Sequence, residues 1–138
     1  MFENLISDTI DELELPVDNT RMEEVSDWLA HRDDTTNVTG RYGHLLHQLA
    51  AKYGRVPSYI ANTTVASRDL LYRSNIITSL QELLEDMVTV YRPVQSNGEY
   101  VYVEVLCMYV ALRTAGMTRE EACNRLVRQL SHTAMERN

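Results

Sequence analysis

The stretch "QLAAKYGRVPSYIANTT", residues 48–64, predicts a tight corner between two helices. Gly54 can adopt the left-handed backbone conformation that commonly closes a helix. Pro57 suits the first position of the next helix, where its missing N–H would have no partner within the helix. Because leucines recur at helical spacing before the corner, we expect one helix over residues 42–53 and a short second helix from Pro57.

Apolar residues recur at helical spacing in three further segments, residues 2–14, 20–32 and 118–134. In the last two segments, Thr20 and Thr118 are each followed three residues later by a glutamate. This is the spacing of a capping box, in which the two side chains satisfy backbone N–H groups of the first turn. We therefore expect all three segments to be amphipathic helices.

The strongest apolar pattern lies in residues 67–91, where Leu70, Ile77 and Leu84 are spaced by seven. This pattern indicates a long amphipathic helix. The Ser–Asn pair at residues 74–75 marks the alternative, a break within that helix. In a continuous helix the three apolar side chains would share one ridge, and that ridge is the candidate surface for a homodimer.

Residues 99–115 combine two conflicting patterns. Asn97 and Gly98 are a hairpin signal, and the tyrosines and valines that follow favour a strand. However, the segment has no glycine or proline over seventeen residues, and it shows no polar alternation before Glu104. We interpret it as a helix that is apolar nearly all round. We expect such a helix to lie buried at the centre of the bundle.

Together these patterns predict an all-α fold, a bundle of five or six helices in which residues 1–138 form a single domain. A chain of this length buries enough apolar surface to fold without disulfide or metal staples. Cys107 and Cys123 lack metal-ligand spacing, so we expect reduced thiols. A disulfide is the alternative, because a hairpin turning near Gly116 would bring the two cysteines to similar height.

Several classes of protein lack their signatures in this sequence. The first residues are acidic where a signal peptide needs a basic flank, and no apolar run approaches the ~20 residues of a membrane helix. We therefore expect a cytoplasmic protein without a membrane partner. The absence of a nucleophile elbow and of a phosphate-binding glycine loop argues against an enzyme and against a cofactor. His44 and His47 lack a carboxylate or thiol partner at ligand spacing, so we expect no metal site.

Charge is distributed unevenly along the chain, whose net charge is −7. Residues 1–34 carry eleven acidic residues against two arginines, whereas residues 35–81 carry an excess of four positive charges. A concentrated negative field attracts a partner protein with a basic surface. We therefore expect the partner to bind exposed acids of the first two helices: Asp8, Asp11, Glu12, Glu23, Glu24 and Asp27.

The corner in residues 45–64 resembles that of bacterial helix-turn-helix regulators at its alanine, glycine and aliphatic positions, Ala50, Gly54 and Ile60. The resemblance implies that the second helix lies in the major groove of duplex DNA. The residues that would then contact phosphates or base edges are Lys52, Arg55, Ser58, Tyr59 and Asn62. The sequence departs from the usual pattern at four positions: Arg55, Val56, Thr63 and Thr64.

We interpret the chain as a non-enzymatic regulatory or inhibitory protein that acts by protein–protein binding through an acidic helical face. Compact acidic binders of this kind are typical of phage or plasmid accessory proteins. The alternative is a helix-turn-helix transcription regulator that binds DNA. The negative net charge decides this ranking, because it repels DNA at long range unless the positive middle of the chain has a face of its own.

Overall fold

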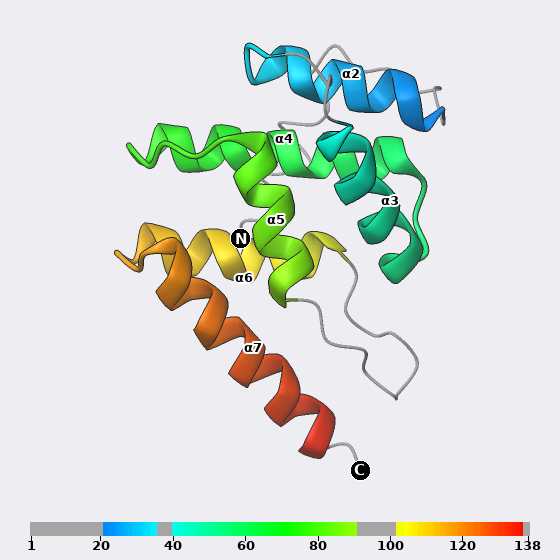
Figure 1. Ribbon diagram of the computed structural model, residues 1–138. Coiled ribbons are helices and arrows are strands. Elements are labelled where there is room, and N and C mark those ends of the chain that lie inside the picture. The colour runs from blue at the N-terminus through cyan, green and yellow to red at the C-terminus, as the bar shows by residue number, and fades with distance from the viewer. Residues whose placement is uncertain (1–20, 36–39, 91–101, 137–138) are drawn as a thin grey trace.

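The structure is a computed structural model that describes residues 21–35, 40–90 and 102–136, with side chains described as far as residue 130. Six helices occupy these ranges, and no strand occurs in them, so the all-α prediction is confirmed (Figure 1). The predicted helix over residues 2–14 lies outside the described residues. The helices are α2 (Met22–Arg32), α3 (Arg41–Tyr53), α4 (Pro57–Arg73), α5 (Leu80–Val90), α6 (Tyr102–Thr114) and α7 (Arg119–Glu136).

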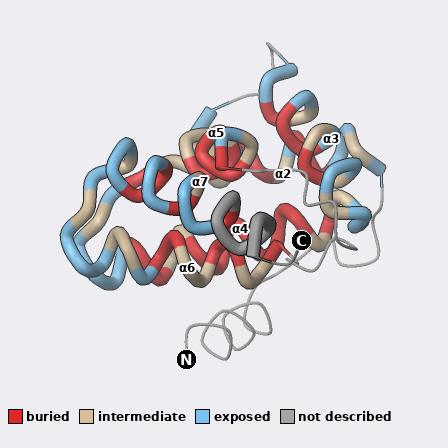
Figure 2. Tube along the Cα trace, turned by 90° about the horizontal axis from the view of Figure 1, so that it is seen from below, coloured by how far each residue is buried: buried red, intermediate tan, exposed pale blue. Residues whose placement is uncertain are grey.

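The helix α4 lies at the centre of the bundle. It packs against α2, α3, α5 and α6, and its residues 60–67 are buried without interruption. Figure 2 shows buried segments where the helices meet and exposed residues on their outer sides and at their ends. Three buried residues of α4, Thr63, Thr64 and Ser67, donate their hydroxyl hydrogens to carbonyl oxygens one turn earlier, at 2.7, 2.7 and 2.9 Å. These bonds satisfy the hydroxyls inside the core.

The helix predicted near residues 99–115 is confirmed as α6, but its central position in the bundle is not. The helix α6 packs mainly against α4 and α7. It buries one side, which includes Tyr102 and Tyr109, while Val103 and Cys107 remain half-buried. The central place goes to α4 because its small side chains let four neighbouring helices approach. None of the described helices, the apolar α6 included, is long and apolar enough to cross a membrane.

The corner between α3 and α4 forms as the sequence predicts. Gly54 adopts a left-handed conformation, with φ 63° and ψ 40°, and the N–H of Arg55 donates to the carbonyl oxygen of Ala50 at 3.1 Å. Pro57 is the first residue of α4. However, α4 is not short, because it continues without a break to Arg73.

The long helix predicted over residues 67–91 is wrong, and the alternative break is confirmed. Asn75 has a left-handed φ of 64°, and the chain resumes a helix only at α5. Leu70 and Leu84 are consequently buried, whereas Ile77 is exposed. The three side chains do not share one face, so they do not form the predicted homodimer ridge.

The capping box predicted at the start of α7 is confirmed. The N–H of Thr118 donates to Oε1 of Glu121 at 3.0 Å, and the N–H of Glu121 donates to Oγ1 of Thr118 at 3.1 Å. The helix α2 also forms at its predicted place, beginning after Arg21. Thr20, the predicted cap of α2, lies outside the described residues.

Replacing Glu121 with alanine should remove a pH-dependent part of the stability. The backbone hydrogen bond from Thr118 lowers the pKa of Glu121 below its ordinary value of 4.5. A lowered pKa in the folded state stabilises the fold above the unfolded pKa, and this contribution is lost as the pH falls through the folded pKa. The wild type should therefore melt at a higher temperature than Glu121→Ala at about pH 7, and the gap should shrink by about pH 3. A gap that does not change with pH would contradict this expectation.

Candidate functional site

The acidic residues of α2 lie on its solvent-exposed side. Glu23, Glu24 and Asp27 are all exposed, and Oε1 of Glu24 lies 2.9 Å from the guanidinium of Arg21. Because Glu23 and Asp27 are four residues apart, they share one face of the helix. The structure therefore brings together the α2 half of the predicted partner-binding face. The other three predicted acids lie outside the described residues: Asp8, Asp11 and Glu12.

The residues of the predicted DNA-reading corner are divided between the surface and the core. Lys52 and Arg55 are exposed, and the guanidinium carbon of Arg55 lies 5.6 Å from the centre of the half-buried Tyr59 ring. Ser58 and Asn62 are buried. Little of either side chain is therefore accessible in this arrangement. Contact of these two residues with DNA stays a prediction.

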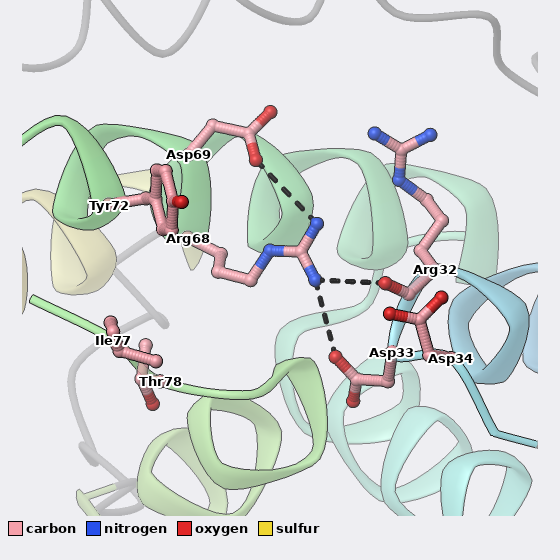
Figure 3. Close-up of a pocket in the computed structure, with 8 residues that line it drawn as sticks. All are labelled: Arg32, Asp33, Asp34, Arg68, Asp69, Tyr72, Ile77 and Thr78. Carbon is pink, nitrogen blue, oxygen red and sulfur yellow. Dashed lines mark hydrogen bonds and ion pairs between the residues drawn. The ribbon is translucent and has the colours of Figure 1, made fainter.

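A pocket of about 440 Å³ opens between the C-terminal end of α2, the C-terminal half of α4 and the turn that leads to α5 (Figure 3). Its lining combines charged residues with two exposed apolar residues, Tyr72 and Ile77, whose exposures are 68% and 84%. The volume lies in the range of binding pockets for small ligands. The lining residues are Arg32, Asp33, Asp34, Arg68, Asp69, Tyr72, Ile77 and Thr78.

Asp33 organises the floor of this pocket. Its carboxylate accepts hydrogen bonds from the hydroxyl of Tyr42 at 2.5 Å and from the guanidinium of Arg68 at 3.2 Å. It also accepts hydrogen bonds from the backbone N–H groups of Leu80 and Gln81, at 2.9 and 3.1 Å. These are the first two residues of α5, so the carboxylate caps that helix. This Asp33 cluster, Asp33 with its four donors, ties α2, α3, α4 and α5 together.

The two arginines of the pocket differ in their surroundings. The guanidinium of Arg68 lies between two carboxylates, 3.2 Å from Asp33 and 3.7 Å from Asp69. The guanidinium carbon of Arg32 lies 5.1 Å from the centre of the Trp28 ring. Among the described residues, the buried Nε of Arg32 has no hydrogen-bond partner. The guanidinium of Arg68 is thus held by ion pairs with two aspartates. The guanidinium of Arg32 is directed away from Asp33 (Figure 3).

A second aspartate holds α5 to α6 and α7. The carboxylate of Asp86 accepts a hydrogen bond from the hydroxyl of Tyr109. It also accepts two from Arg119, at 3.0 Å from Nε and 2.9 Å from Nη2. Arg119 extends a further bond to Oε2 of Glu82 at 2.6 Å. The hydrogen bonds to Asp86 raise the pKa of Arg119 above its ordinary value. These four residues form the Asp86 cluster.

The polar groups of the two clusters are held in hydrogen bonds. Four donors contact the Asp33 carboxylate, so its acceptor positions are in use. Burial raises the pKa of Tyr42 and of Tyr109 above the ordinary value, so both hydroxyls remain protonated donors.

The cysteines and histidines are candidate thiol nucleophiles and metal ligands in the part of the chain that the structure describes. Cys107 and Cys123 are not joined by a disulfide in this structure. Burial raises the pKa of the Cys123 thiol to about 12, so this group remains a weak nucleophile. Within the three described ranges, no group of three or more His, Cys, Asp or Glu residues could hold a metal ion.

Comparison with known protein families places this arrangement in a family. The sequence matches the MoxZ family over residues 26–131, which is more than half of the chain. The chain belongs to the MoxZ family. No curated protein and no solved structure matches the sequence.

The MoxZ match begins in α2 and ends in α7. It therefore includes both aspartate clusters and every residue that lines the pocket. Of the six acids predicted to bind a partner, only Asp27 lies within the matched residues. The MoxZ region is thus the bundle with its two clusters, and most of the acid-rich start of the chain precedes it.

The residues that shape the pocket carry no local signal in the sequence. Asp33 follows a predicted helix within "DDTTNVTG", a polar stretch typical of a loop. Its partners lie up to 48 residues further along the chain, so no local spacing points to them. The seven-residue spacing predicts Ile77 on the apolar ridge, and the structure places it at the surface. The signal that could have placed it at the surface is the Ser–Asn pair at residues 74–75, which predicts a turn.

Proposed function

We propose that the protein is a non-enzymatic regulatory or inhibitory protein that binds another protein through an acidic face on α2. The observation that supports this proposal most directly is the row of exposed carboxylates on that helix, Glu23, Glu24 and Asp27, with the exposed Asp34 just beyond its end. Glu23 and Asp27 are four residues apart within the 11-residue helix, so the carboxylates on α2 extend over about 6 Å.

The charge of this face is only partly neutralised within the chain. Among the described residues, Glu24 pairs with Arg21, whereas Glu23, Asp27 and Asp34 take part in no ion pair with a described residue. Exposed carboxylates of this kind steer a basic protein surface during association. Binders of this size and charge suit an accessory protein of a phage or plasmid, and we include that context in the proposal.

Reversing the exposed charges of α2 should weaken partner capture without changing helix content. In the variant Glu23→Lys/Asp27→Lys both substitutions lie at exposed positions, and lysine is a good helix former. We expect capture from a lysate of the native host to fall by about tenfold, a loss of about 1.4 kcal/mol in binding free energy. The measurement is an affinity pull-down quantified by mass spectrometry, with circular dichroism to check the helix content.

The matched control for Glu23→Lys is Glu120→Lys. Both glutamates are exposed and both lie in the first turn of their helices, α2 and α7. The single variants Glu23→Lys and Glu120→Lys therefore change the net charge and the helix dipole interaction equally, so the control is compared with Glu23→Lys alone. Unchanged capture by the double α2 variant, or a loss in Glu120→Lys equal to that in Glu23→Lys, would contradict binding through α2. Parallel pull-downs with nuclease test the DNA-binding alternative, which predicts that capture depends on nucleic acid.

A further inference from the structure

Exposed apolar side chains gather at the pocket beside the acidic face. The described part of the chain has three large exposed hydrophobic residues, Val56, Tyr72 and Ile77. Two of these three, Tyr72 and Ile77, line the same pocket. Figure 3 shows them together on one side of it. Apolar groups that adjoin each other on a surface and are surrounded by polar groups are a mark of interaction sites.

The turn that carries Ile77 is held firmly in place. The N–H groups of Asn75 and Ile76 donate to carbonyl oxygens in the last turn of α4, both at 2.9 Å. On the other side, the N–H of Ser79 donates to Oε1 of Glu82 at 3.0 Å, and the N–H of Glu82 donates to Oγ of Ser79 at 3.0 Å. Ile77 thus projects from a short segment that is fixed at both ends. An apolar group presented in this way loses little conformational entropy on binding.

The charges inside the pocket favour a cation. Arg68 is the single positive charge between the carboxylates of Asp33 and Asp69. Asp34 is exposed and takes part in no ion pair with a described residue. The guanidinium of Arg32 is directed away from the aspartates (Figure 3) and lies over the Trp28 ring instead. The aspartate side of the pocket therefore keeps an excess of negative charge.

We propose that this pocket anchors a segment of the partner protein in which an arginine or lysine is adjacent to a leucine-like residue. The apolar side chain packs on Tyr72 and Ile77, and the cation pairs with Asp34 and Asp69. Central apolar anchors with charged surroundings supply most of the binding energy at many interfaces. The inference rests on the proposed function, because it takes the partner to be a protein with a basic surface, and it specifies the anchor that such a partner would use.

The test uses a displayed library of random linear peptides, selected on the purified full chain. We expect the selected peptides to carry an arginine or lysine adjacent to an aliphatic residue. Their affinities for the wild type and for variants are measured by fluorescence anisotropy. Ile77→Ser should raise the Kd by about tenfold or more, and Asp34→Asn should raise it by about threefold. Asn tolerates the left-handed φ of 58° at residue 34, so the second change removes only the charge.

The matched control is Val56→Ser, which makes a similar change at an exposed residue that does not line the pocket. It should leave the Kd unchanged. Ile77→Ser and Asp34→Asn should melt like the wild type because their side chains are exposed, and Val56→Ser, at the N-cap of α4, should melt no lower than the wild type because serine is a favoured cap. Peptides that lack a cation, or that bind Ile77→Ser as tightly as the wild type, would overturn the proposal. Sedimentation showing a wild-type dimer that Ile77→Ser dissociates would also overturn it, because the occupant would then be a second copy.

The outcome is distinguishable from that of the pull-down experiment. Glu23 and Asp27 do not line the pocket, so reversing their charges should change the peptide affinities far less than Ile77→Ser does. If the α2 variant no longer captures the partner while Ile77→Ser still binds both the partner and the peptides, the result supports binding through the acidic face and contradicts the anchor at the pocket. If Ile77→Ser alone loses the peptides, the anchor stands even where the acidic face fails.

Discussion

Replacing Asp33 with alanine should lower the free energy of unfolding by roughly 3–5 kcal/mol. The Asp33 side chain is only 6% exposed, and its removal leaves the Tyr42 hydroxyl and two N–H groups of α5 without their acceptor. It also takes one of its acceptors from the Arg68 guanidinium, which keeps the carbonyl oxygen of Arg32 and the carboxylate of Asp69. Each buried donor that loses its partner costs roughly 1–3 kcal/mol. Because natural domains have free energies of unfolding of about 5–15 kcal/mol, this single change should remove a large part of the stability of the protein. Urea denaturation followed by circular dichroism measures it.

Two neighbouring substitutions serve as controls for Asp33→Ala. Asp34→Asn changes the next residue, which is exposed, so it should alter the free energy of unfolding by less than about 0.5 kcal/mol. Asp33→Asn keeps the shape of the side chain and one strong acceptor oxygen, but its amide NH₂ group faces donors. Its effect should therefore lie between the other two. If Asp33→Ala proved as mild as Asp34→Asn, the Asp33 cluster would not be the element that holds α2 to α5.

Local sequence signals predicted those parts of the fold whose cause is local. Gly54 and Pro57 lie within three residues of each other, and together they determine where α3 ends and where α4 begins. Thr118 and Glu121 form their capping box entirely within the first turn of α7. In each case the interacting groups are close in the chain, so their spacing carries the necessary information.

The position of α4 could not be read in the same way. The sequence predicts α6 as the central helix because residues 99–115 are apolar nearly all round. The structure buries Thr63, Thr64 and Ser67 because each hydroxyl bonds to a carbonyl oxygen of its own helix. Polarity alone therefore predicts exposure wrongly wherever a short side chain can satisfy its hydrogen bond within the helix.

The spacing of Leu70, Ile77 and Leu84 was misleading for a different reason. A repeat of seven places residues on one face only while the helix is continuous. The left-handed conformation of Asn75 ends that continuity, and the chain changes direction before α5 begins. The same turn exposes Ile77 and so creates the apolar side of the pocket. The error in the predicted fold and the missed site thus have one cause.

The helix α5 is held at two positions by similar sets of side chains. At its start, Asp33 accepts hydrogen bonds from a tyrosine and an arginine, Tyr42 and Arg68. Further along, Asp86 accepts from a tyrosine and an arginine as well. The first set joins α5 to α2, α3 and α4, and the second joins it to α6 and α7. The pocket lies beside the first set, so its shape depends on a helix that both clusters hold in place.

Replacing Asp86 with alanine should lower the free energy of unfolding by roughly 2–4 kcal/mol, somewhat less than Asp33→Ala. The Asp86 side chain is 9% exposed, and its loss removes the acceptor of the Tyr109 hydroxyl and of Nε of Arg119. Nη2 of Arg119 loses one acceptor and keeps the carbonyl oxygen of Glu82. However, the Arg119 side chain is 36% exposed, whereas that of Arg68 in the other cluster is 20% exposed. Water can therefore solvate Arg119 in part after the substitution, which reduces the cost.

A double-mutant cycle tests whether the pair itself is responsible. In the background of Arg119→Met, the change Asp86→Ala should cost less than it does in the wild type, with a coupling energy of about 1–2 kcal/mol. The matched control is Glu82→Gln, because Glu82 contacts the same arginine but is 41% exposed. Exposed ion pairs contribute little, so this change should cost less than about 1 kcal/mol. If Glu82→Gln cost as much as Asp86→Ala, the stability would follow the charge of the cluster and not its burial. If the two substitutions have additive effects on the free energy of unfolding, the Asp86–Arg119 pair contributes no coupling energy. Asp86 would then stabilise α5 mainly through its hydrogen bond with Tyr109.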